Sequence, residues 1–356
     1  MRVAIVSPGF PPDRGGVEAH VEALAEGLTA AGVDVEVFCA HRGARSTHVA
    51  GTGSVVVHTF PAWRVSSMSI SPRLLWRALR LGPGFDVIHV HSYHATSGAA
   101  ALVGLRARVV FTPHYHGVGH SRAAELLHRV YGRFGSVLFR LSRAVICVSE
   151  VEQELIVHDF PRCADRITVI PNGTNVIGIG AAAPFPNEPP TVLSVGRLAA
   201  YKHTERLVAA MADVSEHAQL VVIGDGPERA ALEARVRDSG MEGRIRFTGQ
   251  VDDVTLRRWL RTAAVLVSLS EQEAFGMAPV EAASAGARVV LSDIPAHREL
   301  ERLYLGDAAR IVAGHLDVAS TIGELLMLKD RVVVEVPDWP SVAASTMSVY
   351  RSVCKR

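Results

Sequence analysis

Short apolar runs alternate with longer amphipathic stretches along nearly the whole chain of 356 residues. The apolar runs of the first half lie at 3–7, 33–39, 55–59, 87–90, 109–112, 144–148 and 167–170. Those of the second half lie at 191–195, 220–223, 245–247, 265–268 and 289–291. Runs of this length predict buried strands, and the stretches between them, such as 16–31 and 126–141, are long enough for helices. The alternation therefore predicts an α/β protein built on parallel sheets.

One segment, residues 172–190, interrupts the alternation. Seven of its residues are glycine or proline, a composition typical of linkers. The length of the chain also favours two domains. We therefore predict an N-terminal domain of residues 1–175, a linker of residues 176–190 and a C-terminal domain of residues 191–338. Two α/β domains commonly bind a ligand in the cleft between them, at the carboxyl ends of their strands.

The composition excludes several classes of protein. Hydrophobic residues make up 48% of the chain and charged residues 21%, so the chain can bury a core and is not disordered. The 37 basic and 36 acidic residues nearly cancel, which argues against a nucleic-acid partner held by general electrostatics. The four cysteines form no CxxC pair, which excludes a zinc ribbon or a disulfide scaffold and fits a cytoplasmic location. No apolar run reaches the roughly 18 residues of a membrane span. Peripheral contact with the inner face of a membrane stays open.

The most informative segment covers residues 268–283, after a predicted strand and into a predicted helix. Backbone amides near Gly276, at the start of that helix, would be free to bind an anion. Glu273 would lie in the loop and Glu281 about one turn inside the helix, and carboxylates accept hydrogen bonds from hydroxyl groups well. The segment therefore predicts a site for a polyhydroxylated ligand that also carries phosphate. The alternative is a pair of ordinary surface glutamates.

Two basic residues follow the first predicted strand of the second domain. Arg197 offers a planar fork of donors and Lys202 a compact charge, so together they could neutralise a diphosphate. The alternative is that both are solvated. Lysine is rare in this chain, which holds only Lys202, Lys329 and Lys355 among its 37 basic residues, and this rarity favours a specific role for Lys202.

The loop after the first predicted strand carries Gly15 and Gly16 directly before a predicted helix. Glycines at such a place let the backbone approach a ligand at the helix start, although a purely structural turn is the alternative. The loop does not match GxGxxG, so the dinucleotide fingerprint is absent and an NAD-dependent oxidoreductase is disfavoured.

Taken in order, these segments resemble the family 4 retaining glycosyltransferases. Glu273 and Glu281 are similar to the two ends of the family's Glu-x7-Glu motif, and Arg197 with Lys202 resembles its diphosphate-binding segment. Further resembling segments are the glycine loop at 15–18, the end of the first domain at 169–173 and the turn at 224–227. The resemblance implies the GT-B fold, in which two Rossmann-like domains face each other across a cleft. It also implies that the C-terminal helix, residues 339–356, crosses back and packs on the first domain.

The same resemblance implies a role for each candidate residue. Arg197 and Lys202 would bind the diphosphate of the sugar donor, Glu273 the hydroxyls of the transferred sugar, and Glu281 the ribose. His114 would lie near the anomeric carbon, so the implied catalytic residues are His114, Arg197, Lys202 and Glu273. The other implied donor-binding residues are Gly15, Gly16, Gln250, Val251, Phe275, Gly276 and Met277.

The implied activity is that of a hexosyltransferase that needs no cofactor. It would move a sugar, with retention, from a UDP- or GDP-sugar to a glycan, lipid-linked or cell-surface acceptor. A small natural product such as an antibiotic aglycone is the competing acceptor. The competing functions are those of a nucleotide-sugar hydrolase or epimerase, and of a sensing or scaffolding protein with a degenerate site. Leu269, Ala274 and Asn175 stand where the family usually has proline, glycine and aspartate, and the first two leave the identity of the sugar open.

Twelve of the 16 histidines lie in the first domain. His89 and His91 would share one face of a strand, and a metal site is one alternative for such a cluster. No carboxylate or cysteine completes a known ligand spacing, so we predict no metal. His116 and His120 would line the acceptor site or lie in an ordinary loop. Residues 121–142 carry apolar and arginine side chains at helical spacing, which fits a helix packed on the sheet or lying on an anionic bilayer. The sequence predicts no oligomeric state.

Overall fold

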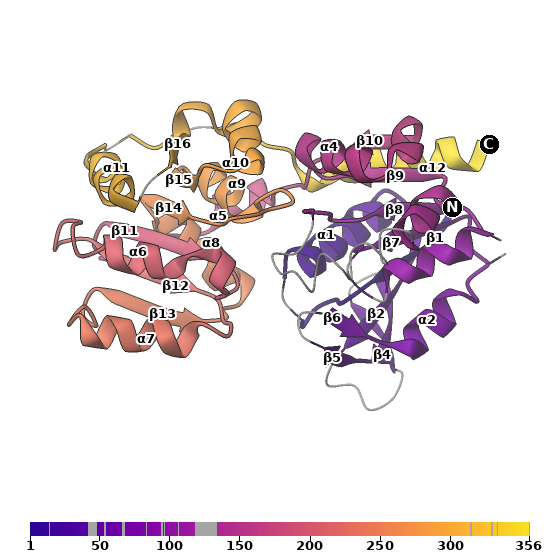
Figure 1. Cartoon of the computed structure of the whole chain (residues 1–356), viewed down its shortest axis with the longest axis horizontal. Coiled ribbons are helices and arrows are strands. Elements are labelled where there is room, and N and C mark those ends of the chain that lie inside the picture. The colour runs from indigo at the N-terminus through magenta and orange to yellow at the C-terminus, as the bar shows by residue number, and fades with distance from the viewer. Residues whose placement is uncertain are drawn as a thin grey trace. The chain divides into compact units, whose positions relative to one another are not determined.

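The computed structural model describes the whole chain except residues 14, 42–47, 53–54, 66–67, 83, 94, 96, 106, 118–133, 314, 329, 333 and 356. The chain forms two compact units (Figure 1). The first unit consists of Met1–Gly173 together with Trp339–Arg356, and the second is Thr174–Asp338. The chain therefore passes between the units at two points, after Gly173 and after Asp338.

The first unit is built on one large sheet with strand order β10-β9-β8-β7-β1-β2-β4-β3. All neighbouring strands are parallel except β3, which is antiparallel to β4. The strands are β1 (Arg2–Ser7), β2 (Asp34–His41), β3 (His48–Thr52), β4 (Val55–Pro61), β7 (Val87–His91), β8 (Val109–Thr112), β9 (Ala144–Cys147) and β10 (Ile167–Val169). A separate hairpin, β5 (Trp63–Val65) and β6 (Met68–Ile70), and strand β3 are additions to the predicted set.

Helices connect these strands, as parallel strands require. They are α1 (Gly16–Ala30), α2 (Pro72–Ala78), η1 (Gly98–Leu105), α4 (Glu150–Asp159), η2 (Pro161–Arg166) and α12 (Trp339–Lys355). Residues 134–141 are also helical. Helix α12 comes last in the chain but packs along α1 in the first unit, where its yellow ribbon lies among indigo and magenta elements (Figure 1). Gly27 of α1 permits this close packing, because a Cβ there would lie 3.0 Å from the Cβ of Ala343.

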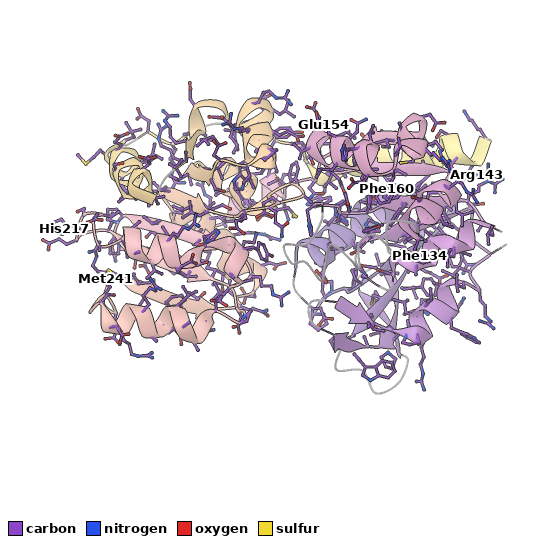
Figure 2. The ribbon with its side chains drawn as sticks, viewed as in Figure 1. Phe134, Arg143, Glu154, Phe160, His217 and Met241 are labelled. Atoms are coloured by element: carbon purple, nitrogen blue, oxygen red, sulfur yellow. The ribbon has the colours of Figure 1, made fainter. Side chains whose placement is uncertain are left out.

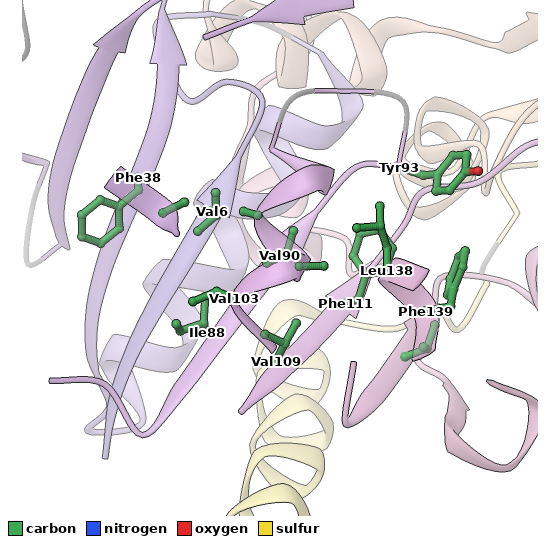
Figure 3. Close-up of a cluster of buried hydrophobic side chains, with 14 of the residues drawn as sticks. Val6, Phe38, Ile88, Val90, Tyr93, Val103, Val109, Phe111, Leu138 and Phe139 are labelled. Atoms are coloured by element: carbon green, nitrogen blue, oxygen red, sulfur yellow. The ribbon is translucent and has the colours of Figure 1, made fainter. Parts of the chain in front are cut away.

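The alternation of side chains along β1 produces two separate cores. Val3 and Ile5 pack with α1 and α12, through residues such as Leu24 and Tyr350. Val6 points to the opposite face. That second core includes Phe38, Ile88, Val90, Tyr93, Val103, Val109, Phe111, Leu138 and Phe139 (Figure 3). Phe134 and Phe160 also pack into it (Figure 2). Both faces of the sheet are therefore covered, which explains why its central strands are apolar almost throughout.

The second unit is a six-stranded parallel sheet with the order β13-β12-β11-β14-β15-β16. Its strands are β11 (Thr191–Val195), β12 (Gln219–Ile223), β13 (Ile245–Gly249), β14 (Val265–Ser268), β15 (Arg288–Ser292) and β16 (Ala309–Val312). Strand β16 was not predicted. The helices are α5 (Val176–Ala181), η3 (Ala200–Lys202), α6 (Thr204–Ala210), α7 (Arg229–Asp238), α8 (Asp253–Thr262), α9 (Met277–Ser284), α10 (Pro295–Leu300), η4 (Glu301–Leu305), η5 (Gly306–Ala308) and α11 (His315–Met327).

Residues 176–190, which the sequence predicts to be a linker, belong to the second unit. Helix α5 packs against α8 and α9. The amide of Phe185 donates a hydrogen bond to Thr262 Oγ1 at 2.8 Å, and its ring lies 4.5 Å from the ring of Trp259. The glycines and prolines of this segment therefore form a short helix and turns that are packed against the unit.

In both units the strand order reverses direction at one point of the sheet. The reversal lies between β1 and β7 in the first unit and between β11 and β14 in the second. Ligands of open α/β sheets bind at such a point, beyond the carboxyl ends of the strands. No helix among the described residues is both long enough and apolar enough to cross a membrane.

Candidate active site

In the second unit, candidate residues gather where β11 and β14 end. Lys202, in η3 after β11, forms an ion pair with Glu273, which follows β14. The side chains of Lys202 and Glu273 are only 21% and 18% exposed. Ser270 donates a second hydrogen bond, 2.9 Å long, to the same oxygen of Glu273. The fold thus brings together two candidates that are 71 residues apart in sequence.

Arg197 lies in a tight turn directly after β11. Gly196 has φ +154°, and its amide donates to the carbonyl of Ile223 at 3.0 Å. Arg197 and Lys202 line the same pocket, at the carboxyl edge of the sheet, with Ser268 and Ser270. Both basic candidates therefore line one pocket with Ser270, the residue that donates a hydrogen bond to Glu273.

The Arg197 turn rests on a second turn that follows β12. A Cβ at Gly224, which has φ +134°, would lie 1.9 Å from the carbonyl oxygen of Gly196. A Cβ at Gly226 would lie 2.2 Å from the carbonyl oxygen of Leu198. Glycine is required at both positions, because any side chain would push the two turns apart.

Gln250 and Val251 follow β13, two strands away from β11. They are connected to the site through backbone, since the amide of Gly224 donates to the carbonyl of Gly249 at 2.9 Å. The turns after β11, β12 and β13 therefore form a continuous row along the carboxyl edge. The structure places Gln250 and Val251 at the far end of this row from Glu273.

Helix α9 begins beside the ion pair. Its N-cap is Gly276, with φ +96°, so the helix start has no side-chain cap. Phe275 is buried, and Met277 is the first residue of the helix. An uncapped helix start binds anions through its backbone amides. The predicted anion site near Gly276 is thus adjacent to the residues that end β14.

Glu281 lies in α9, and burial raises its pKa to about 7. The negative charge of Asp253 adds to the rise, whereas Arg257 opposes it. A carboxyl with this pKa is partly protonated at neutral pH, so it can donate as well as accept a hydrogen bond. Such a group suits a ligand with adjacent hydroxyls.

In the first unit, histidines gather beyond β7 and β8. His91 ends β7 and His114 follows β8 with φ +47°, and Nδ1 of His91 lies 3.3 Å from Nε2 of His114. His20, from α1, places its ring 5.3 Å from that of His91 and 5.0 Å from that of His114. His89 is held between two hydroxyls, with Nδ1 2.6 Å from Tyr350 and Nε2 2.8 Å from Thr112.

Burial keeps these imidazoles neutral. It lowers the pKa of His20 to about 4 and that of His89 to about 3. The pKa values of His91 and His114 are also far below the ordinary value, because burial and the neighbouring imidazoles both disfavour the charged form. Nitrogens of His20, His91 and His114 lie within 4.8 Å of one another, so among the described residues these three could hold a metal ion. The absence of a metal stays a prediction.

Two family models match this chain, and each lies mainly within one of the two units. The model of Glycosyltransferase Family 4 matches residues 14–176, and the model of Glycosyl transferases group 1 matches residues 180–313. A phosphatidyl-myo-inositol mannosyltransferase of Mycobacterium leprae is 30% identical over 377 residues, which cover 99% of this chain and 97% of that protein. The chain belongs to the family 4 glycosyltransferases.

A second relative is the GDP-mannose:cellobiosyl-diphosphopolyprenol alpha-mannosyltransferase of Komagataeibacter xylinus. It is 27% identical over 383 residues, covering 100% of this glycosyltransferase and 94% of the relative. The crystal structure of HepE from Anabaena, in complex with UDP and glucose, has the same fold, with a TM-score of 0.71 at 17% identity over 100% of this chain and 98% of HepE. The predicted GT-B fold, family and hexosyltransferase class are therefore confirmed.

The glycine loop of this glycosyltransferase lies against an acidic side chain. The carboxylate of Glu18 lies against it, because a Cβ at Gly15 would be 2.3 Å from Oε2 of Glu18 and one at Gly9 would be 2.7 Å from Oε1. Nothing would meet a Cβ at Gly16 within 4 Å. The anionic group beside the start of α1 is thus a side chain of the protein, and a ligand phosphate would have to displace it.

The acceptor candidates are only partly described. His116 is exposed, two residues after His114. His120 lies outside the described residues, as does most of the predicted helix over 121–142. In the described part of that helix, Leu138 and Phe139 are buried in the sheet's core and Arg140 is exposed.

Sequence reasoning missed three residues of the glycosyltransferase. Ser270 lies within the segment 268–283, and its spacing of three residues from Glu273 is the available signal. His297, at the start of α10, is buried with Nδ1 3.0 Å from Ser292 Oγ, and its ring lies 4.0 Å from a Cβ placed on Gly276. No sequence pattern connects His297 to Glu273. In the structure, burial lowers the pKa of His297, and the negative charge of Glu273 partly opposes this shift. The third residue is Asn172, which contacts His20 in the first unit.

Substitution Gly224→Ala is expected to destabilise the second unit by about 2 kcal/mol and to weaken nucleotide binding, because the new Cβ must displace the Arg197 turn. Urea unfolding and calorimetric titration with UDP and GDP measure the two effects. Gly240→Ala is the matched control, since Gly240 also has a positive φ, +67°, but nothing lies within 4 Å of its Cβ position. It should cost about 1 kcal/mol and leave nucleotide affinity unchanged. Equal effects of the two variants on affinity would contradict the role of the turn.

Proposed function

We propose that this glycosyltransferase transfers a hexosyl group from a UDP- or GDP-sugar to a lipid-linked or glycan acceptor, with retention of the anomeric configuration. The observation that carries the proposal is the Lys202–Glu273 ion pair at the point where the strand order of the second unit reverses. The relatives add support for the substrates: one is named for GDP-mannose and a diphosphopolyprenol, another for phosphatidyl-myo-inositol.

The sugar donor binds to the second unit in this proposal. Arg197, Lys202 and the amides at the start of α9 hold the diphosphate, and they stabilise the charge that grows on its oxygens as it leaves. Glu273 accepts hydrogen bonds from hydroxyls of the transferred sugar. Glu281 pairs with the two ribose hydroxyls, for which its partly protonated carboxyl is suited. Gln250 and Val251 lie beside the base.

The ion pair with Glu273 gives Lys202 a second role, before any ligand is bound. In the unliganded protein it neutralises Glu273, which would otherwise be a lone, largely buried carboxylate. When the diphosphate binds, the ammonium is shared between the phosphate and Glu273. When the sugar donor binds, oxygen lone pairs of Glu273 thus become available to accept hydrogen bonds from the hydroxyls of the sugar.

The first unit binds the acceptor, with His114 beside the anomeric carbon. Because His114 is neutral, it orients hydroxyl groups by hydrogen bonding and carries no charge. A bond forms between the acceptor oxygen and the anomeric carbon on the face from which the diphosphate departs. The bond from that carbon to the phosphate oxygen breaks, and the departing phosphate takes the acceptor's proton. This front-face path needs no protein carboxylate as nucleophile.

The test is a matrix of sugar donors and acceptors. UDP-glucose, UDP-N-acetylglucosamine, GDP-mannose and a dTDP-sugar are each offered with phosphatidylinositol vesicles, a polyprenyl-diphosphate sugar or a soluble glycan. Release of UDP or GDP that depends on a lipid-linked or glycan acceptor, with a product of unchanged anomeric configuration by NMR, supports the proposal. Release of nucleotide without an acceptor would favour a hydrolase instead. Turnover only with small aglycones would contradict the acceptor class.

A lipid-linked acceptor also requires contact with a membrane surface. We propose peripheral contact, and flotation with anionic vesicles measures it. Binding that grows with the anionic lipid fraction and falls with salt is expected. Failure to float at low salt would leave soluble glycans as the acceptors.

A further inference from the structure

Two residues contact the same histidine, His20, and each of them flanks a point where the chain passes between the units. Asn172 stands just before the first passage and Trp339 just after the second. Oδ1 of Asn172 lies 2.7 Å from Nδ1 of His20, and the ring of Trp339 meets the ring of His20 edge-on at 5.3 Å. All three residues belong to the first unit, so these contacts are internal to it.

The contact with Asn172 fixes the protonation of His20. An amide oxygen only accepts hydrogen bonds, so Nδ1 of His20 must carry the proton and donate it. His20 is 3% exposed and Asn172 5% exposed, so water cannot replace either partner. Burial therefore makes this hydrogen bond costly to break, because each partner would be left unsatisfied.

The same ring also contacts His114. The rings of His20 and His114 meet edge-on at 5.0 Å, and His91 lies against both. His114 has a left-handed backbone conformation, φ +47°, which is unusual for a residue with a side chain. Its imidazole is held in position by His20 and His91, both from elements distant in sequence.

We propose that His20 is a positioning residue, which holds the imidazole of His114 at a fixed place relative to the two chain passages. The hydrogen bond to Asn172 and the contact with Trp339 anchor the His20 ring, and this ring in turn contacts His114. A displacement of the chain at either passage therefore also displaces the ring of His114. This inference rests on the proposed function, in which His114 lies beside the anomeric carbon.

Two variants separate the contact of His20 with Asn172 from its contact with His114. His20→Asn keeps a nitrogen donor near the position of Nδ1 but removes the ring that contacts His114. His20→Phe keeps a ring but removes the donor to Asn172. Both are expected to lower kcat by about 10- to 100-fold, since small displacements of a catalytic group have effects of this size. Nucleotide affinity should change less than about twofold, because the nucleotide site is in the other unit.

The control is His158→Asn, at a histidine of α4 whose side chain is 86% exposed. It should have the activity of the unsubstituted protein. Circular dichroism establishes that each variant is folded. A folded His20→Asn or His20→Phe variant with kcat within twofold of the unsubstituted protein would overturn the proposal. An equal loss of nucleotide affinity and kcat would point to general disruption and would also overturn it.

A second measurement needs no substrate, so it separates failure of this inference from failure of the proposed function. Nitrogen-15 NMR of the imidazoles should find His114 as one fixed neutral tautomer at pH 7. In His20→Asn, its tautomers should average and its pKa should rise toward the ordinary value. An unchanged His114 signal contradicts the proposal. So does stoichiometric Zn²⁺ in the purified protein that is lost in His20→Asn, since the cluster would then be a metal centre.

Discussion

Lys202→Ala lowers kcat/KM for the sugar donor by about 10²–10³-fold, which is the range for removing one group that stabilises a developing negative charge. The loss has two physical sources. The departing diphosphate loses a cation, and Glu273 loses the partner that neutralises it, so its uncompensated charge then faces an anionic ligand. Steady-state kinetics with the sugar donor identified by the substrate matrix measures the effect.

Two further lysine variants sharpen this result. Lys355→Ala removes a lysine from the last turn of α12 and is expected to have no effect on kinetics. Lys202→Arg keeps the charge but replaces a compact ammonium by a larger planar group, so it should recover only part of the activity. Near-normal kinetics of a folded Lys202→Ala variant would remove Lys202 from the site. Full activity of Lys202→Arg would mean that only charge matters there.

Acidification from pH 7 to pH 5 selectively destabilises the first unit. His20 and His89 titrate in the folded protein at about 4 and about 3, far below the value of about 6.5 expected when unfolded. Below pH 6.5 the unfolded chain binds protons that the folded chain does not. The free energy of unfolding therefore falls by about 1.4 kcal/mol per pH unit for each histidine, or about 2 kcal/mol each at pH 5.

The second unit should respond less. Glu281 has a raised pKa of about 7, so it gains a stabilising contribution as the pH falls, which offsets the loss from the buried His297. Hydrogen exchange at pH 7, 6 and 5 follows the two units separately. His89→Gln should make the loss in the first unit shallower by about 1.4 kcal/mol per pH unit. His217→Gln, at an exposed histidine of the second unit (Figure 2), should change nothing. Equal destabilisation of both units would contradict this prediction.

The sequence was informative about the fold because most strands are buried on both faces. Strands such as β7 and β14 are short apolar runs bounded by polar turns, and these were predicted within a few residues. Strand β16 has only four residues, two of them buried, so it carries little apolar signal. The composition of the segment after Gly173 predicts a linker, because glycine and proline indicate a break in regular structure, but it does not show whether the turns pack against a neighbouring helix.

The candidate site was predictable in part. The residues that end β11 and β14 could be paired, because the strand order of a doubly wound sheet reverses at its first strand, which then lies beside a strand that comes later in the chain. The contact between Asn172 and His20 could not be predicted, since it joins residues 152 positions apart and depends on the packing of α1 against the end of the first unit. The position of Glu18 beside the glycine loop depends on a side-chain conformation that sequence does not specify.

The position of α12 has a consequence for the order of folding. A ribosome makes the first unit's sheet before the second unit, but Val342, Val349 and Tyr350 of α12 complete one of its two cores. Until α12 emerges, the face of α1 that packs along it stays uncovered. The second unit, a continuous segment, needs nothing that is synthesised after it. The half of the protein that is translated first is therefore the half that finishes folding last.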